Sequence, residues 1–144
     1  RYFMLNSGDE KEDILRYEAH LGEFRFVKRY IQLAHDANKF GLDGIVVGAP
    51  SPENHITDQE LSRVRKYVND DMIVLCPGAG EQGGEAQALL NHFGKDNVIV
   101  NVGRGLMFPK SSYSTPEEQA EAARFYRDML NEKRAALDLA SELH

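Results

Sequence analysis

The sequence has 144 residues, of which 42% are hydrophobic, so it is long enough and apolar enough to build one domain around a buried core. Its formal net charge of −6 argues against a broad surface for nucleic acid or anionic membranes, because both require a surplus of Lys and Arg. Any phosphate that the protein binds must therefore be held by a few local groups.

The cysteine count and the hydropathy of the sequence exclude several kinds of site and of cellular location. Cys76 is the only cysteine, so an internal disulfide and a zinc site built on several thiolates are both excluded. No apolar run approaches the roughly 20 residues of a membrane-spanning helix, and the first residues lack the layout of a signal peptide. We expect a soluble, cytoplasmic protein. The start at Arg1, followed at once by an apolar run, indicates a chain that begins partway through a fold.

The first predicted unit is a strand, a loop and a helix. Tyr2 to Leu5 is a short apolar run, and Asn6 to Asp9 are turn-forming residues. Helical periodicity is expected to follow, through Leu15, Phe24, Val27, Ile31 and Leu33.

Two similar units come next. Gly44 to Gly48 predicts a buried strand, and after a proline-containing loop a polar helix carries apolar positions at Leu61, Val64 and Val68. Met72 to Leu75 predicts another strand, which leads into a glycine-rich segment and a short helix that Gly94 ends.

The last unit completes a recognisable architecture. Val98 to Val102 predicts a strand, and Thr115 to Glu118 opens a long helix with capping residues and a proline in its first turn. Strands that are apolar at nearly every residue, separated by helices, predict a parallel sheet covered by helices. The expected fold class is α/β, with about four βα units, which is half of a TIM (β/α)8 barrel. We expect residues 1–144 to form a single domain.

Two segments follow the last two predicted strands. Pro77 to Gly84 holds four glycines in eight residues, which lets backbone N–H groups turn towards an anion, and Gln82 adds a neutral donor. Gly103-Arg104-Gly105 offers a guanidinium fork, with glycines that admit a ligand closely. Each segment alone is also compatible with an ordinary turn. Together they lie where such barrels bind phosphate, after strands seven and eight.

The two segments resemble the signature of the orotidine 5'-monophosphate decarboxylase family. The match consists of Pro77-Gly-x-Gly-x-Gln82-Gly83-Gly84 and of Val102-Gly103-Arg104, and Gly48 to Glu53 resembles the loop after the family's sixth strand. The resemblance spans essentially the whole chain but covers only fold units five to eight. It therefore identifies the chain with the C-terminal half of the barrel, the half that carries the phosphate-binding loops.

The resemblance also implies roles for individual residues. Gln82 and Arg104 would hold the phosphate of the nucleotide, and Gly103 would offer its backbone amide to it. Ser7 stands where the family has a serine that contacts the pyrimidine ring, although a plain loop serine fits this position as well.

The implied reaction removes CO₂ from orotidine 5'-monophosphate (OMP) and gives uridine 5'-monophosphate (UMP), with no metal or organic cofactor. The family's catalytic Lys and Asp array, centred on an Asp-x-Lys-x-x-Asp motif, is missing here. The run from Asp9 to Asp13 has the wrong spacing and is interpreted as a solvated charge run. The five histidines show no metal-ligand spacing, and Lys110 and Tyr113 receive no role. We therefore expect a carboxy-lyase only as part of a complete barrel, and an inactive chain on its own.

Several alternatives stay open at this point. One is a related sugar-phosphate decarboxylase or synthase, and another is a non-catalytic half-barrel that binds phosphorylated ligands or serves as an assembly subunit. A third is a portion of a complete enzyme. In each case the open sheet edges predict a partner, either the missing N-terminal half-barrel or a second copy of the chain in a homo-oligomer.

Overall fold

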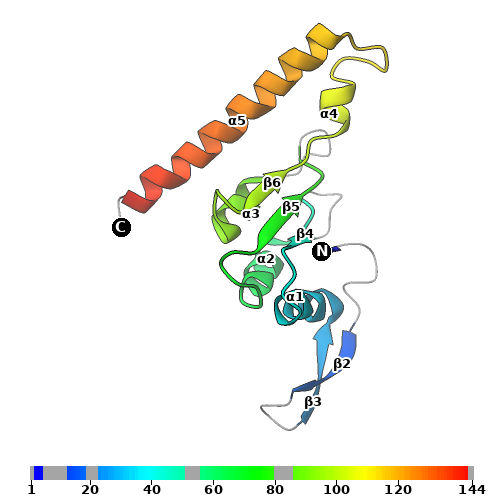
Figure 1. The fold of residues 1–144 in the computed structure, drawn as a ribbon, viewed down its shortest axis with the longest axis vertical. Helices are drawn as coiled ribbons and strands as arrows, with labels where there is room; N and C mark the ends of the chain where they lie inside the picture. The colour runs from blue at the N-terminus through cyan, green and yellow to red at the C-terminus, as the bar shows by residue number, and fades with distance from the viewer. Residues whose placement is uncertain (1, 5–12, 19–22, 51–55, 80–85, 143–144) are drawn as a thin grey trace.

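The computed structural model describes residues 2–4, 13–18, 23–50, 56–79 and 86–142, with side chains described from residue 26 to residue 139 within these ranges. Its strands are β1 (Tyr2–Met4), β2 (Asp13–Glu18), β3 (Glu23–Lys28), β4 (Gly44–Val46), β5 (Ile73–Cys76) and β6 (Val98–Val100). Its helices are α1 (Arg29–Lys39), α2 (Asp58–Arg65), α3 (Ala86–Phe93), α4 (Arg104–Met107) and α5 (Pro116–Glu142), as Figure 1 shows.

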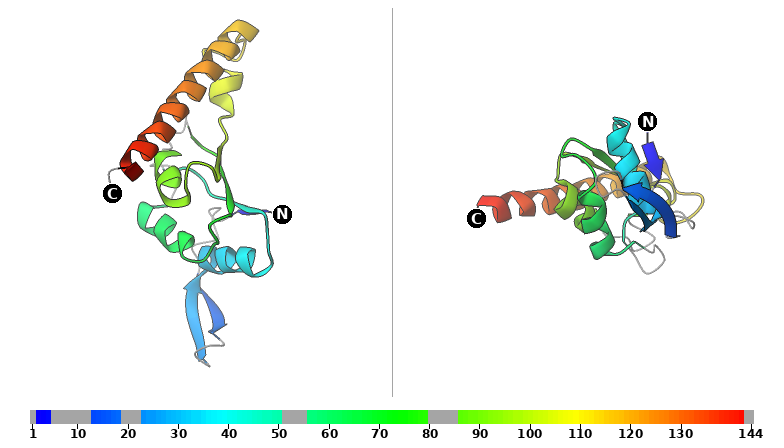
Figure 2. Two further views of the ribbon diagram at one scale, coloured as in Figure 1. Left: turned by 60° about the vertical axis from the view of Figure 1, so that its left-hand side comes forward. Right: turned by 90° about the horizontal axis from the view of Figure 1, so that it is seen from below.

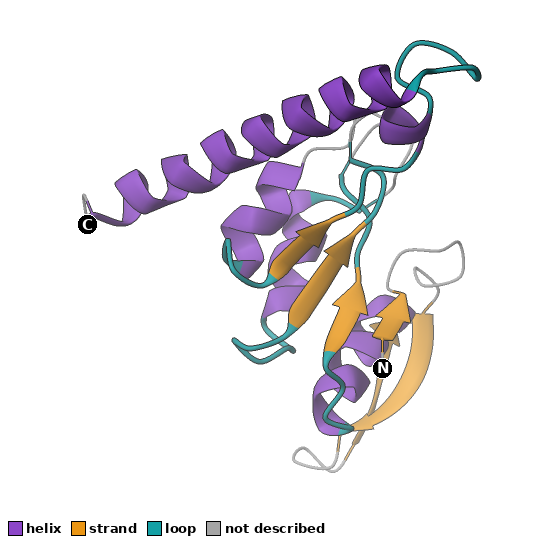
Figure 3. Cartoon of the chain, turned by 45° about the horizontal axis from the view of Figure 1, so that its top comes forward, coloured by secondary structure: helices purple, strands orange, loops and turns teal. Residues whose placement is uncertain are grey.

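The core of the fold is a four-stranded parallel sheet in the order β1-β4-β5-β6. Helices α1, α2 and α3 connect successive strands and lie on one side of the sheet (Figure 3). Towards these helices the sheet presents Ile45, Val74 and Val98, which are register partners and are buried. The expected α/β class and the partial barrel of about four βα units are thus confirmed.

Each helix covers the sheet with one apolar stripe. In α1, Ile31 and Ala34 are buried, as the helical periodicity predicts for Ile31. In α2, Leu61 and Val64 are fully buried, and in α3 Leu89 is as well. These residues form one hydrophobic core between the helices and the sheet.

The opposite face of the sheet is only partly covered. Val46 and Leu75 are half-buried, and their register partner Ile99 is 54% exposed. Strand residues alternate between the two faces of a sheet, so these three residues belong to the face away from α1–α3. In a closed barrel this face would point into the barrel interior.

Residues 13–28 contradict the predicted helix over this stretch. They form the antiparallel hairpin β2–β3, paired from Asp13↔Lys28 to Glu18↔Glu23, and the helix begins only at Arg29. The sequence of β3 alternates charged and apolar residues from Glu23 to Phe26, as in a strand, and aromatic residues favour strands. In Figures 1 and 2 the hairpin extends beyond α1, at the opposite end of the molecule from α4.

Helix α5 runs back along the molecule from α4 to α3, with which it is in contact (Figure 1). Its predicted start is confirmed, because the Thr115 amide donates to Glu118 at 2.9 Å and the Glu118 amide donates to Thr115 Oγ1 at 3.3 Å. Near its other end, Arg134 donates to the carbonyl of Val98 at 3.2 Å. Neither α5 nor any other described helix has the length and apolarity to cross a membrane.

Candidate functional site

The segments that follow β4, β5 and β6 lie side by side, because parallel strands end at the same edge of a sheet. Two backbone hydrogen bonds extend the pairing beyond the strands themselves. The Ala49 amide donates to the carbonyl of Pro77 at 2.8 Å, and the Asn101 amide donates to the carbonyl of Cys76 at 2.9 Å. The start of the glycine-rich segment and the start of Gly103-Arg104-Gly105 are therefore brought together.

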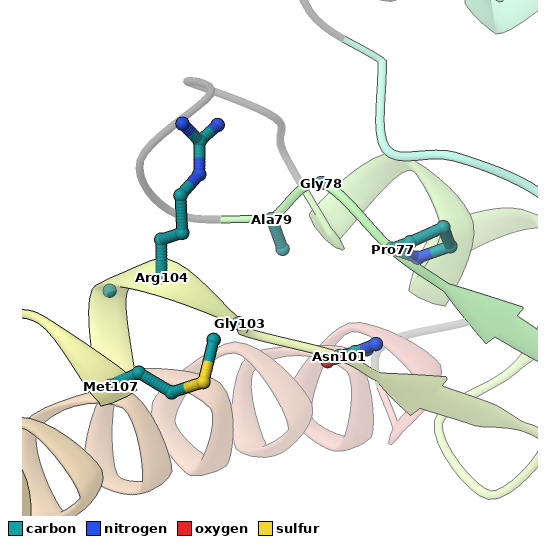
Figure 4. Close-up of a pocket in the computed structure, with 8 residues that line it drawn as sticks. Pro77, Gly78, Ala79, Asn101, Gly103, Arg104 and Met107 are labelled. Atoms are coloured by element: carbon teal, nitrogen blue, oxygen red, sulfur yellow. The ribbon is translucent and has the colours of Figure 1, made fainter.

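A pocket of about 320 Å³ opens between these two segments (Figure 4). It is lined by Pro77, Gly78, Ala79, Asn101, Gly103, Arg104, Gly105 and Met107. Its size is near the lower end of the usual range for small-molecule sites, about 300–1,000 Å³. Among the described residues, the lining combines backbone from small residues, the cationic side chain of Arg104 and the amide of Asn101, which suits a small anionic group.

Glycine at position 78 makes the first turn of this pocket possible. Gly78 has a φ of 82°, in the left-handed region that side chains with a Cβ rarely adopt. The chain therefore turns sharply after β5 and presents Gly78 and Ala79 to the pocket. This confirms the predicted glycine turn after the strand.

Arg104 stands at the other wall. It is the first residue of α4, which Gly103 precedes as the N-cap. In Figure 4 the Arg104 side chain extends from the start of α4 on the side where Ala79 lies, and the Met107 side chain lies below it, towards Gly103. A guanidinium in this position can give two parallel hydrogen bonds to a phosphate or carboxylate.

Cys76 lies directly before the pocket but is not a candidate nucleophile. The side chain is fully buried, and burial raises the pKa of its thiol to about 12. A thiol with this pKa is protonated at neutral pH, and the thiolate is the reactive form.

Of the predicted site residues, Gly103 and Arg104 line the same pocket, whereas Gln82 and Ser7 lie outside the described residues. Asn101 was missed, because the sequence places it inside an apolar run that continues to Val102, whereas β6 ends at Val100. A polar residue within such a run was the one available signal.

The other ionisable residues bear on the question of a metal site. In the part of the chain that the structure describes, no group of three or more His, Cys, Asp or Glu side chains gathers where a metal ion would be held. His92 pairs instead with Asp58 at 2.8 Å and links α3 to α2. Of the charged run near the N-terminus, Asp13 begins β2, and residues 9–12 are not described.

Comparison with known proteins bears on these geometric observations. No family model matches the sequence. The chain is 36% identical over 115 residues to an orotidine 5'-phosphate decarboxylase of Haloarcula marismortui, a match that covers 79% of the chain and 39% of the relative. It is 30% identical over 135 residues to the enzyme of the same name from Dehalococcoides mccartyi, covering 90% of the chain and 46% of the relative. The chain thus spans less than half the length of these curated relatives.

A solved structure agrees with the fold. A crystal structure from Toxoplasma gondii, described as an orotidine-monophosphate-decarboxylase, superimposes with a TM-score of 0.65 at 23% identity. The superposition covers 94% of the chain and 50% of that protein. At this identity the likeness shows the fold. Half of the Toxoplasma gondii protein has no counterpart in this chain, which agrees with a partial barrel.

Proposed function

We propose, from the premise that the chain is a relative of the orotidine 5'-phosphate decarboxylases, that it supplies the phosphate-binding half of such a barrel. The observation that carries the proposal is the pocket in which Arg104 and Gly103 face the glycine turn at Gly78. The complete barrel would convert OMP to UMP and CO₂.

Electrostatics support a phosphate as the occupant of this pocket. The chain as a whole carries a net charge of −6, which repels a nucleotide at long range. A binding site for a phosphate dianion therefore needs a positive charge close to the phosphate, and Arg104 supplies this charge. The small residues of the two backbone segments leave the pocket accessible to the ligand. Gln82, in the segment after Ala79, is proposed to add a neutral donor, and the amide of Gly103 another.

In this proposal the present half of the barrel binds the phosphate, and the N-terminal half supplies the catalytic residues. The Lys and Asp residues that the reaction requires have no counterpart in the sequence, so we propose that the chain alone has no decarboxylase activity. Its contribution to catalysis would be indirect, because binding energy from the non-reacting phosphate can be used to order the reacting ring and lower the barrier. Loss of the contacts to the phosphate should therefore reduce kcat as well as the affinity for the nucleotide.

The proposal requires a partner for the open face of the sheet. Ile99 is 54% exposed there, beside half-buried Leu75 and Val46. The N-terminal half of the barrel would cover this face and pair with the sheet edges, and a second copy of the chain is the alternative occupant. We propose that the protein acts in the cytoplasm. We also expect that the isolated chain does not form a stable, well-folded monomer in dilute solution. Sedimentation of the isolated chain as such a monomer would contradict this expectation.

The test of the proposed function is a comparison of two ligands that differ only in the phosphate. In the complete barrel, or in this chain complemented by its missing half, Arg104→Ala should weaken UMP by about 10- to 150-fold and leave uridine nearly unchanged, because a charge-assisted hydrogen bond contributes about 1.5–3 kcal/mol. Arg104→Lys should recover only part of the loss, because it keeps the charge but not the planar fork.

A matched control separates site binding from overall charge. Arg127 on α5 is exposed and pairs with Asp128 at 2.7 Å, so Arg127→Ala removes the same charge away from the pocket. It should leave the ratio of UMP to uridine affinity unchanged. Equal weakening of both ligands by Arg104→Ala, or of neither, would overturn the proposed phosphate site.

A further inference from the structure

The two glycines that flank Arg104 have different surroundings. A Cβ added at Gly103 would meet no atom of the described residues within 4 Å, whereas a Cβ added at Gly105 would lie 2.5 Å from Tyr126 Oη and 3.1 Å from Tyr126 Cζ. Gly105 does not have a positive φ, so its backbone would accept a side chain. An alanine at position 105 would therefore require Tyr126 or α4 to shift, although the backbone conformation itself would allow it.

Tyr126 belongs to α5, which supports α4 at a second point as well. Gln119 Nε2 donates to the carbonyl of Met107 at 2.8 Å, at the end of α4. Residues 119 and 126 are two helical turns apart and so lie on one face of α5. This face of α5 therefore touches α4 near both of its ends.

The support matters because α4 cannot define its own orientation. It has four residues, Arg104–Met107, and Gly103 gives it no side-chain cap. A helix of one turn gains too few hydrogen bonds to be stable by itself. The direction in which Arg104 leaves the chain must then depend on what α4 rests against.

We propose that Tyr126 is a positioning residue for Arg104, acting through its contact with Gly105. The contact fixes the start of α4 against α5, and with it the approach of the guanidinium to the pocket. The second glycine of Gly103-Arg104-Gly105 lines the pocket and also serves this packing, which the sequence alone does not indicate. The inference rests on the proposed function, because it assumes that Arg104 holds the phosphate.

The test is a double-mutant cycle on the complete barrel that contains this chain, with UMP and uridine as the probes. Gly105→Ala should weaken UMP by roughly 10-fold or more with uridine unchanged, because small displacements of a binding group have effects of this order or larger. Tyr126→Phe alone should change little, since the ring stays in place. In the double variant, Tyr126→Phe should restore most of the UMP affinity, because it removes the hydroxyl that the new Cβ meets first.

Two further variants serve as a control and as a substitute for Gly105→Ala. Phe125→Leu alters the neighbouring, 63% exposed position of α5 and should leave both affinities unchanged. Should Gly105→Ala fail to fold, Tyr126→Ala in the parent protein removes the support directly and should weaken UMP selectively.

The positioning role is overturned if Gly105→Ala leaves the ratio of UMP to uridine affinity unchanged, or if Tyr126→Phe does not restore it. Where Gly105→Ala does not fold, an unchanged ratio in Tyr126→Ala has the same meaning. The Arg104→Ala result tells this failure apart from a failure of the proposed function. If Arg104→Ala weakens UMP selectively while residues 105 and 126 show no coupling, only the positioning role is lost.

Discussion

The two faces of the parallel sheet differ in what covers them. Towards the helices, Val74 and Val98 are fully or almost fully buried, whereas on the other face Ile99, one residue after Val98, is 54% exposed. Both faces are apolar in sequence, so composition alone does not distinguish them. The difference shows that this chain completes the core on one face of the sheet and leaves the other face partly uncovered.

The largest expected effect comes from the covered face. Leu89 of α3 is fully buried in the core between helices and sheet. Leu89→Ala should lower the free energy of unfolding by about 2–5 kcal/mol, because it removes buried methyl groups and leaves a cavity. Urea denaturation measures this change, and a loss below about 1 kcal/mol would mean that the covered face is loosely packed.

A matched pair of neighbours tests the contrast between the faces directly. Val98→Thr should cost about 1–3 kcal/mol, because it places a hydroxyl in an apolar layer. Because the isolated chain is expected to associate, both variants are compared by urea unfolding at several protein concentrations. Ile99→Thr should change the concentration-independent part of the stability by no more than about 0.5 kcal/mol, since the position is exposed within the chain. Its cost should appear in the concentration-dependent part and in the complete barrel, where this face is expected to be covered. Equal concentration-independent costs for the two variants would remove the distinction between the two faces.

Much of this sheet could be predicted from the sequence, because its strands are short apolar runs bounded by turn residues. The burial of Ile31, Leu61 and Val64 also follows from helical periodicity. The hairpin at residues 13–28 could not be predicted in the same way, since Leu15 and Phe24 fit a helical spacing as well as a strand.

In the candidate site, too, the sequence predicts local features but not tertiary contacts. Gly103 and Arg104 were identified because they follow a predicted strand and match a family motif, and the pocket contains both. The contact of Gly105 with Tyr126 depends on how α5 returns to α4, which is a tertiary arrangement that no local pattern encodes. The roles of Gln82 and Ser7 stay predictions.

A smaller effect is expected at the start of α2, which helps to cover the packed face. Thr57 and Glu60 form a capping box, in which the Thr57 amide donates to Glu60 Oε2 at 2.8 Å and the Glu60 amide donates to Thr57 Oγ1 at 3.3 Å. Thr57→Ala should cost about 1 kcal/mol, because an amide at the helix start loses its acceptor. Thermal unfolding measures the loss, and Thr57→Ser should restore most of the stability.

The smallest effect at neutral pH concerns Cys76, which is buried in the covered layer. Its pKa is raised from 9.0 to about 12, so between these values the unfolded chain has lost the thiol proton and the folded protein has kept it. This contribution to stability is complete below pH 9 and falls as pH rises towards 12. At neutral pH, we expect a thiol reagent to label Cys76 slowly in the folded protein and rapidly in denaturant. Rapid labelling of the folded protein would contradict the burial of this residue.

The central claim concerns the carboxyl edge of the sheet, where the two faces meet the loops. A crystal structure of the complete barrel with UMP bound would test it most directly. The phosphate should lie in the pocket between Gly78 and Arg104, with a phosphate oxygen within hydrogen-bond distance of the Arg104 guanidinium and of the Gly103 amide. A phosphate bound elsewhere, with Arg104 directed away from it, would contradict the assignment of this half as the phosphate-binding half.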